Sequence, residues 1–340
     1  MGELIGLSPD IRILYPSENA MKQPVFARPA SAAAQKGSTP TAPAQRPRLC
    51  LLSDLLDEWQ SEAQAAHEAR VSQTLRGPIT GFKKLDEDLG GCLSPGLHIV
   101  HGQPGTGKTA WALQVAAQCG FPCLYVTCEM APLELLRRHT ARVTKTYLGR
   151  LKSGEIGPRE SLELAQRAVM AAPYLALVDA TRAGAETAFL SQGVEAVRIR
   201  AQENGADSRH VLLVVDSLHS WAEGVAASGR VGEGSEYEIL NAALLGLRGL
   251  SHSAHCPIVA ISERNREAMK SGGLSAGAGT RKLEYGAESV LDLSRVDERE
   301  DAGSAVGVTA RLVKNRSGAS GKETRFSFHG ATQTFEMQKL

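Results

Sequence analysis

The sequence predicts an α/β fold with a mostly parallel sheet, helices on both of its faces, and a C-terminal antiparallel extension of the same sheet. Two observations support this prediction. From Ile79 onward, short continuous apolar runs alternate with helical patterns, as is typical of buried parallel strands joined by helices. After Glu288 the helical patterns stop, and three strand-like runs follow one another: "SVLDLSR", "VGVTARLVKNR" and "TRFSFHG".

The composition limits the class of protein. The 340 residues are 42% hydrophobic and carry a formal net charge of +1. That charge excludes a globally cationic surface, so we expect any nucleic-acid partner to be held by local basic loops. The six cysteines lack C-x-x-C spacing and no secretory signal opens the chain, which favours reduced, mostly buried thiols in a cytoplasmic protein. No apolar stretch approaches the roughly 20 residues of a membrane span.

The N-terminal part differs in composition from the rest. Residues 1–48 are predicted to be a disordered arm or linker, because large apolar side chains are scarce and five prolines lie between Lys22 and Arg48. Residues 49–72 are predicted to form an amphipathic linker helix with Ser53 available as N-cap. Its apolar positions recur every three or four residues: Leu52, Leu55, Leu56, Trp59, Ala63 and Ala66. This helix is expected to pack either on its own core or on a neighbouring subunit, and residues 73–340 to form the main domain.

Five apolar runs predict the parallel strands of that domain. In order they are "GLHIVHG", "FPCLYVTCEM", "YLALVDA", "HVLLVVDS" and "CPIVAIS". Because parallel strands all end at the same edge of a sheet, polar residues that close these runs are expected to lie close together.

The first run leads into the most specific motif of the chain. Residues 102–109 read G-Q-P-G-T-G-K-T, a full match to G-x-x-x-x-G-K-[ST] between a strand and a helix. The backbone N–H groups of such a loop surround phosphates, the lysine adds charge near the β/γ oxygens, and the threonine hydroxyl holds Mg²⁺. The sequence therefore predicts a site for ATP and Mg²⁺, formed by Gly102, Gln103, Pro104, Gly105, Thr106, Gly107, Lys108, Thr109 and Ala110.

Hydrolysis needs a carboxylate as a second ligand for Mg²⁺, and a base that orients the attacking water. Asp216 ends the run "VLLVVD" and is the candidate metal carboxylate, the alternative being an ordinary strand-ending aspartate. The next residue is Ser217, so the Asp-Glu pair of many ring ATPases is absent and the base must come from elsewhere. Glu129 closes the run "CLYVTCE" and is the candidate base, the alternative being a glutamate that only favours a helix dipole.

These motifs resemble the RecA-like ATPase core of DnaB-type hexameric replicative helicases over roughly Ile79 to Phe335. Five stretches carry the resemblance: "ITGFKKLDEDLGGCLSPGLHIVHGQPGTGKT", "YVTCEMAPLELLRR", "LVVDSLHSW", "PIVAISERNREA", and "RKLEYGAESVLDL" followed by "LVKNRSGASG". The resemblance implies that Glu129 activates the attacking water. It also implies a ring oligomer, in which Lys314 and Arg316 enter the ATP site of the next subunit, single-stranded DNA as substrate, and a primase or loader as partner.

Two features depart from the family pattern. The phosphate-sensor position, usually glutamine, is Glu263, which cannot donate a hydrogen bond when it is ionised. The helicases also carry a sizeable N-terminal helical domain, whereas here about 50 residues precede the predicted helix, as in plasmid or mobile-element replication ATPases. An alternative is therefore a regulatory or recombination ATPase similar to RecA, KaiC or RadA that does not unwind DNA. A zinc-bearing branch-migration ATPase and a nucleotide kinase are disfavoured, because the cysteine quartet and an acceptor lid are missing.

Two glycine-rich stretches are expected to face DNA, at residues 222–235 and 268–282. The second carries Lys270, Arg281 and Lys282, which suit phosphate binding without sequence preference, although plain surface loops have a similar composition. Trp221 is expected to pack at the end of its strand and not to stack on a base.

Overall fold

The computed structural model describes residues 49–228, 235–263, 286–296 and 305–338. The chain divides into two compact units, with described residues 49–76 in the smaller and those from 77 onward in the larger. The expected arm at 1–48 lies outside the described residues, as do Lys270, Arg281 and Lys282.

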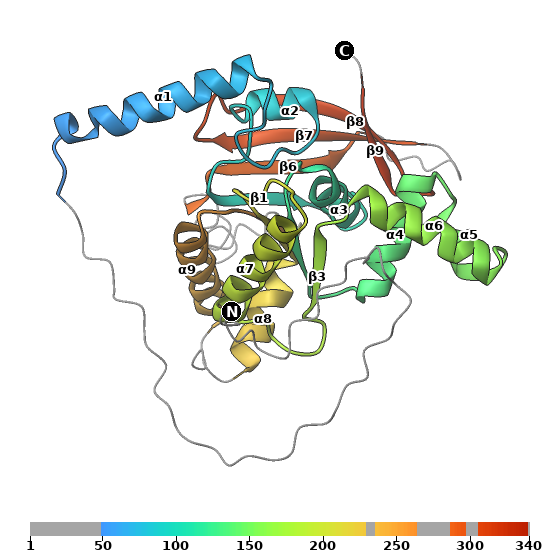
Figure 1. Cartoon of the computed structure of the whole chain (residues 1–340). Coiled ribbons are helices and arrows are strands. Elements are labelled where there is room, and N and C mark those ends of the chain that lie inside the picture. The colour runs from blue at the N-terminus through green and yellow to red at the C-terminus, as the bar shows by residue number, and fades with distance from the viewer. Residues whose placement is uncertain (1–48, 229–234, 264–285, 297–304, 339–340) are drawn as a thin grey trace, which may run out of the picture. The chain divides into compact units, whose positions relative to one another are not determined.

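The smaller unit is helical. A single 3₁₀ turn, Leu52–Leu55, leads into α1, Leu56–Val71, drawn in blue in Figure 1. Ser53 does not cap this helix, because the 3₁₀ turn intervenes and Leu55 takes the position before α1. Instead, the Asp54 carboxylate accepts the backbone N–H of Leu51 at 3.0 Å. The large apolar side chains of α1, Leu56, Trp59 and Val71, are exposed, Trp59 by 73%.

The larger unit is built on one sheet, and the predicted fold class is confirmed. Among the described residues the sheet has nine strands in the order β3-β2-β4-β5-β1-β6-β7-β8-β9 (Figure 1). The five predicted parallel strands all form: β1 (Gly96–Gly102), β2 (Cys123–Thr127), β3 (Leu175–Asp179), β4 (Leu212–Asp216) and β5 (Pro257–Glu263). Every residue of β1, β2 and β4 is buried, as the continuous apolar runs indicated.

The C-terminal strands correct the prediction in one respect. The run "SVLDLSR" forms β6, Ser289–Arg295, which is parallel to β1 and therefore belongs to the parallel part of the sheet. The antiparallel extension consists of β7 (Val306–Asn315), β8 (Glu323–His329) and a short β9 (Thr334–Met337) that the sequence pattern did not indicate.

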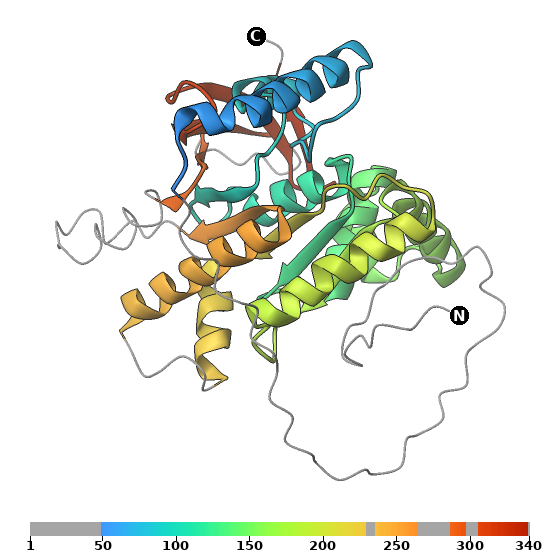
Figure 2. The same cartoon turned by 60° about the vertical axis from the view of Figure 1, so that its left-hand side comes forward.

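Helices cover both faces of the sheet (Figure 2). On one face, α2 (Lys83–Asp88), α3 (Lys108–Gln118) and α4 (Pro132–Thr144) contribute to a core that contains Trp111. On the other face, α7 (Thr187–Glu203), α8 (Leu218–Ala227) and α9 (Glu236–Ala254) contribute to a second core that contains Trp221. Two further helices, α5 (Leu148–Ser153) and α6 (Pro158–Ala171), follow α4. Because helices cover both faces, the parallel strands are mainly apolar on both sides.

The predicted DNA-facing loop at 222–235 is wrong for its first part. Residues 222–227 belong to α8, residues 229–234 lie outside the described part, and Ser235 caps α9. The helix continues because Ala222 is buried and the backbone at Gly224 approaches Gly184 so closely that a Cβ on Gly184 would meet the Gly224 carbonyl oxygen. Trp221 packs as expected, only 1% exposed, with its indole N–H donating to the Ala185 carbonyl at 2.7 Å.

All six cysteines are thiols, of which Cys119, Cys123 and Cys256 are buried and only Cys50 is exposed. Among the helices that the structure describes, none combines the length and apolar character that crossing a membrane requires.

Candidate functional site

The predicted phosphate loop lies between β1 and α3. β1 ends at Gly102 and α3 begins at Lys108, so that the loop sits at the carboxyl end of the central strand and at the N-terminus of a helix. Gly107 takes the position before α3 with φ of +86°, and a Cβ there would lie 2.9 Å from the Phe335 ring. The glycine is therefore needed both for its backbone conformation and for space. We call this edge of the sheet, where β1, β2, β4 and β5 end, the phosphate end.

Lys108 is the cation of the phosphate end. Its side chain is buried, and its Nζ donates to two carbonyl oxygens of its own loop at 2.8 and 3.1 Å. Burial lowers the pKa of Lys108, and nearby Glu263, Asp216 and Glu129, in decreasing order, counteract this shift. The Nζ lies 4.0 Å from Oε1 of Glu263, the residue at the sensor position. Three carboxylates thus lie near the lysine and favour its cationic form, which is the form that can meet a phosphate.

Asp216 lies beside the loop because β4 ends next to β2, with Asp216 opposite Thr127 in the register. It is buried, and its Oδ2 accepts the phenol O–H of Tyr125 at 2.7 Å while the Thr109 hydroxyl donates to the same carboxylate. Burial raises the pKa of Asp216, and the bonds from Tyr125 and then Thr109 oppose that shift. A hydroxyl and a carboxylate side by side form the hard oxygen set that Mg²⁺ prefers.

Tyr125 is a residue that sequence reasoning missed, and its contact predicts an effect on stability. Replacing Tyr125 by phenylalanine is expected to lower the free energy of unfolding by about 1.5–3 kcal/mol, because a buried carboxylate loses a hydroxyl donor. The measurement is urea unfolding followed by circular dichroism. Tyr147→Phe is the matched control, since its ring is 56% exposed, and should change stability by less than about 0.5 kcal/mol. Equal effects of the two substitutions would contradict the assignment.

Glu129 lies two residues beyond the end of β2, at the phosphate end. Its side chain is exposed, and its Oε1 accepts the hydroxyl protons of Ser217 and of Ser220, the latter at 2.7 Å. Among the described residues, no hydrogen bond to Oε2 is present. The candidate base therefore has one oxygen held by hydroxyls and the other open to a ligand.

Lys314 and Arg316 lie away from this site. In the register of β6 with β7, Lys314 pairs with Val290, and the Arg316 backbone N–H donates to the carbonyl of Glu288. The Glu288 backbone in turn donates to Leu97, which precedes Gly102 by five positions on β1, or about 16 Å at 3.3 Å per residue. We call this opposite edge the finger end.

The finger end also holds an ion pair. β7 ends at Asn315, so Arg316 follows the strand, and its Nη1 lies 2.8 Å from Oε1 of Glu288. The Asn315 side chain donates to the carbonyl of Asp88 at 2.7 Å, which attaches the segment to the end of α2.

Arg295 is a second residue that the sequence did not single out. It ends β6, and its Nε and Nη2 donate to the Gly105 carbonyl oxygen at 3.1 and 2.7 Å. Because β6 is parallel to β1, its last residue reaches the phosphate end. The sequence could have indicated this contact, because Arg295 is a cation that closes a predicted strand.

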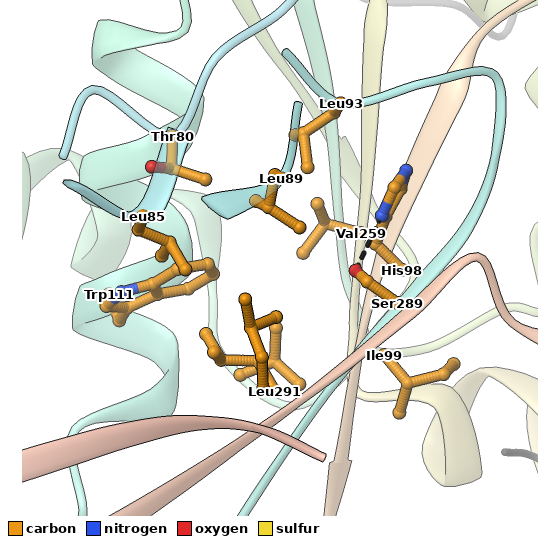
Figure 3. Close-up of a pocket in the computed structure, with 12 residues that line it drawn as sticks. Thr80, Leu85, Leu89, Leu93, His98, Ile99, Trp111, Val259, Ser289 and Leu291 are labelled. Carbon is orange, nitrogen blue, oxygen red and sulfur yellow. Dashed lines mark hydrogen bonds between the residues drawn. The ribbon is translucent and has the colours of Figure 1, made fainter. Parts of the chain in front are cut away.

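A small cavity lies elsewhere in the core (Figure 3). Its volume of about 10 Å³ leaves room for at most one water molecule. His98 faces it, hydrogen-bonded to the Ser289 hydroxyl and the Ser94 carbonyl, both at 2.8 Å. Burial lowers the pKa of His98, which favours the neutral form of its ring. The remaining lining is mainly apolar, including Leu85, Leu89, Leu93, Trp111 and Leu291. The cavity is a packing feature and not a ligand site.

Residues 77–337, more than half of the chain, match the family described as the DnaB-like helicase C terminal domain. The chain belongs to this family.

The DnaB-like domain also has curated relatives. It is 28% identical over 226 residues to the replicative DNA helicase DnaB of Nostoc sp., covering 65% of this chain and 24% of that protein. It is 26% identical over 278 residues to the replicative DNA helicase DnaB of Leifsonia xyli subsp. xyli, covering 77% of this chain and 56% of that protein. The chain thus matches a quarter to about half of the length of these relatives.

Solved structures support the fold of the DnaB-like domain. The ATPase domain of G40P matches with a TM-score of 0.64 and 17% identity, covering 82% of this chain and 98% of that one. A DnaB-like replicative helicase, solved to describe its interactions with primase, also gives 0.64 and 17%, covering 85% and 67%.

Proposed function

We propose that this chain is the ATP-hydrolysing core of a DnaB-like DNA helicase or translocase, which acts on single-stranded DNA as a ring oligomer during DNA replication. The observation that carries the proposal is the convergence of the phosphate loop, Asp216 and Glu129 at the phosphate end. Family membership supports the choice of DNA helicases among the many proteins that carry a phosphate loop.

The residues at the phosphate end fit ATP and Mg²⁺. The N-terminus of α3 and the glycine loop provide backbone N–H groups for the phosphates, and Lys108 meets the charge of the β/γ oxygens. Thr109 and Asp216 would hold the metal ion, which would supply charge neutralisation at those oxygens. Glu129 takes a proton from the attacking water through its open Oε2. Glu263, close to Lys108, occupies the sensor position and senses the γ-phosphate through that lysine.

The finger end offers cations in addition to Lys108 and Arg295, which lie at the phosphate end. A cation aimed at the γ-phosphate stabilises transition-state charge. Lys314 and Arg316 lie too far from their own loop, so we propose that they serve the ATP site of a neighbouring subunit. Service of one subunit's site by the next is what a ring oligomer provides, and six subunits are the number that we propose. We further propose that α1, with its exposed apolar side chains, bridges subunits as a linker helix.

The test of the proposed function is the rate of ATP hydrolysis by the full chain with and without single-stranded DNA, followed by displacement of a labelled strand from a fork. We expect DNA to stimulate hydrolysis and ATP to drive displacement, with Lys108→Ala inactive in both assays. Hydrolysis without displacement would favour a regulatory or recombination ATPase. The absence of any hydrolysis would reject the proposal.

We propose that DNA contacts the basic stretch at 268–282, which lies outside the described residues. Replacing Lys270, Arg281 and Lys282 together by alanine is expected to remove most of the DNA stimulation and leave basal hydrolysis intact. For a single strand, the dependence of log affinity on log salt should flatten by roughly 0.7 units for every phosphate that the protein no longer neutralises. The measurement is fluorescence anisotropy of a labelled oligonucleotide over a salt series.

A matched control replaces three exposed cations of the α4–α6 region, Lys145, Arg159 and Arg167. It should leave the salt slope unchanged. If the control and the triple variant at 268–282 give the same slope, the DNA surface lies elsewhere.

We also propose a cytoplasmic location and a primase or helicase loader as partner. A solved DnaB-like replicative helicase with a similar fold interacts with primase, which supports a primase as the partner proposed here. A pull-down with the primase of the same organism tests it here.

A further inference from the structure

Ser217 and Ser220 hold the candidate base, and nothing in the phosphate-loop motif calls for them. We propose that these two serines are positioning residues that fix Oε1 of Glu129 so that Oε2 faces the attacking water. The inference rests on the proposed function, because it assumes that Glu129 is the base.

The pairing of β2 with β4 places Glu129 next to Ser217. One residue beyond the end of β2 the chain is still paired with β4, since the Cys128 backbone N–H donates to the carbonyl of Asp216, the last residue of β4, at 2.8 Å. Ser217 follows Asp216 directly and therefore meets Glu129, which follows Cys128. Many ring ATPases carry a second acid directly after the metal-binding aspartate. Here that position is Ser217, whose hydroxyl donates to Glu129 beyond the end of β2.

The second serine comes from the first turn of α8. Its backbone N–H points to Ser217 Oγ at 3.5 Å, and the two hydroxyl oxygens are 3.0 Å apart. This turn is rigid because Leu218 is fully buried and Trp221 is anchored by its indole N–H. The serine pair therefore lies on a well-packed turn, whereas the Glu129 side chain is exposed.

Each hydroxyl proton of Ser217 and Ser220 has Glu129 as its acceptor. An ionised carboxylate only accepts hydrogen bonds, and each serine hydroxyl has one proton. Both protons therefore go to Oε1, and the contact between the two hydroxyl oxygens carries none. When water attacks the γ-phosphorus, the new bond is from water oxygen to phosphorus and the bond broken is from phosphorus to the β-γ bridging oxygen. The water proton passes to Oε2.

Such positioning acts on the rate of the chemical step and leaves substrate binding alone. Ser220→Ala removes one donor without removing the α8 cap, which Ser217 provides. We expect kcat to fall about threefold to tenfold with KM unchanged, which is the effect of losing one ordinary hydrogen bond at an exposed side chain. Ser220→Thr, which keeps the hydroxyl, should restore most of the rate. Ser161→Ala, a half-buried serine in the first turn of α6, is the control and should match the parent protein.

A double-mutant cycle separates this inference from the assignment of the base. In a Glu129→Gln background, Ser220→Ala should cause no further loss, because the group that it positions is already disabled. If Glu129→Gln leaves kcat unchanged, the base assignment fails. If Glu129→Gln is nearly inactive while Ser220→Ala has the parental kcat, only the serine inference is overturned. A parallel change in KM, or additive losses in the double variant, would also overturn it.

Discussion

Glu129→Gln is expected to bind ATP with parental affinity and to hydrolyse it about 10²- to 10⁴-fold more slowly, because a positioned general base contributes a factor of that size. The amide has nearly the shape of the carboxylate but cannot take the proton. Lys108 and the glycine loop, which hold the phosphates, stay unchanged. The measurements are nucleotide affinity from a fluorescent ATP analogue and turnover from phosphate release.

Lys108→Ala provides the contrast, since it removes the charge near the β/γ oxygens and should weaken both affinity and turnover. The two variants must therefore differ in affinity. Turnover of Glu129→Gln at the parental rate would show that another residue is the base, and the open Oε2 would then have no catalytic meaning.

Arg316→Ala is expected to reduce turnover by about 10³-fold or more, as the loss of an arginine finger does in other phosphoryl-transfer enzymes. Arg316 lies at the finger end, so the loss should appear at the neighbour's site and not at its own. Mixing variants reveals this. A Lys108→Ala subunit keeps its fingers but has a dead site, while an Arg316→Ala subunit keeps its site but lacks one finger.

Mixed oligomers should regain activity wherever an intact site meets an intact finger, although neither parent turns over alone. Exchange of labelled subunits must be shown in the same samples. A mixture no more active than the sum of its parents, with exchange demonstrated, would reject the finger in trans. Glu288→Gln, which removes the carboxylate paired with Arg316 in the same subunit, separates loss of the finger from loss of this ion pair.

The sequence predicted local features well and distant partners poorly. The phosphate loop and the five parallel strands were found because each depends on neighbouring residues: a motif of eight positions, or an unbroken apolar run. The direction of β6 was missed because its partner, β1, is almost 200 residues away, and a strand pattern carries no sign of orientation.

The same limit applies to the site. The contacts of Tyr125 with Asp216 and of Ser220 with Glu129 each join residues 91 positions apart. A tyrosine inside an apolar strand and a serine inside a helix look ordinary by themselves. The loop expected at 222–235 was partly helix, since burial of Ala222 and the close approach at Gly224 favour a packed turn over the loop that a glycine suggests. The roles of all the site residues stay predictions, including those of Lys108, Thr109, Glu129, Asp216, Glu263, Lys314 and Arg316.

The separation of the phosphate end from the finger end has a consequence for symmetry. If one edge of each subunit serves the other edge of the next, the contact is head-to-tail, and a two-fold dimer, which pairs identical surfaces, cannot form it. An open row of n subunits then has n − 1 complete sites, because the last phosphate end receives no finger. An open head-to-tail pair would have one complete site of two, and only closure of the ring completes every site. Specific activity per subunit should therefore rise with the size of the assembly and level off when the ring closes.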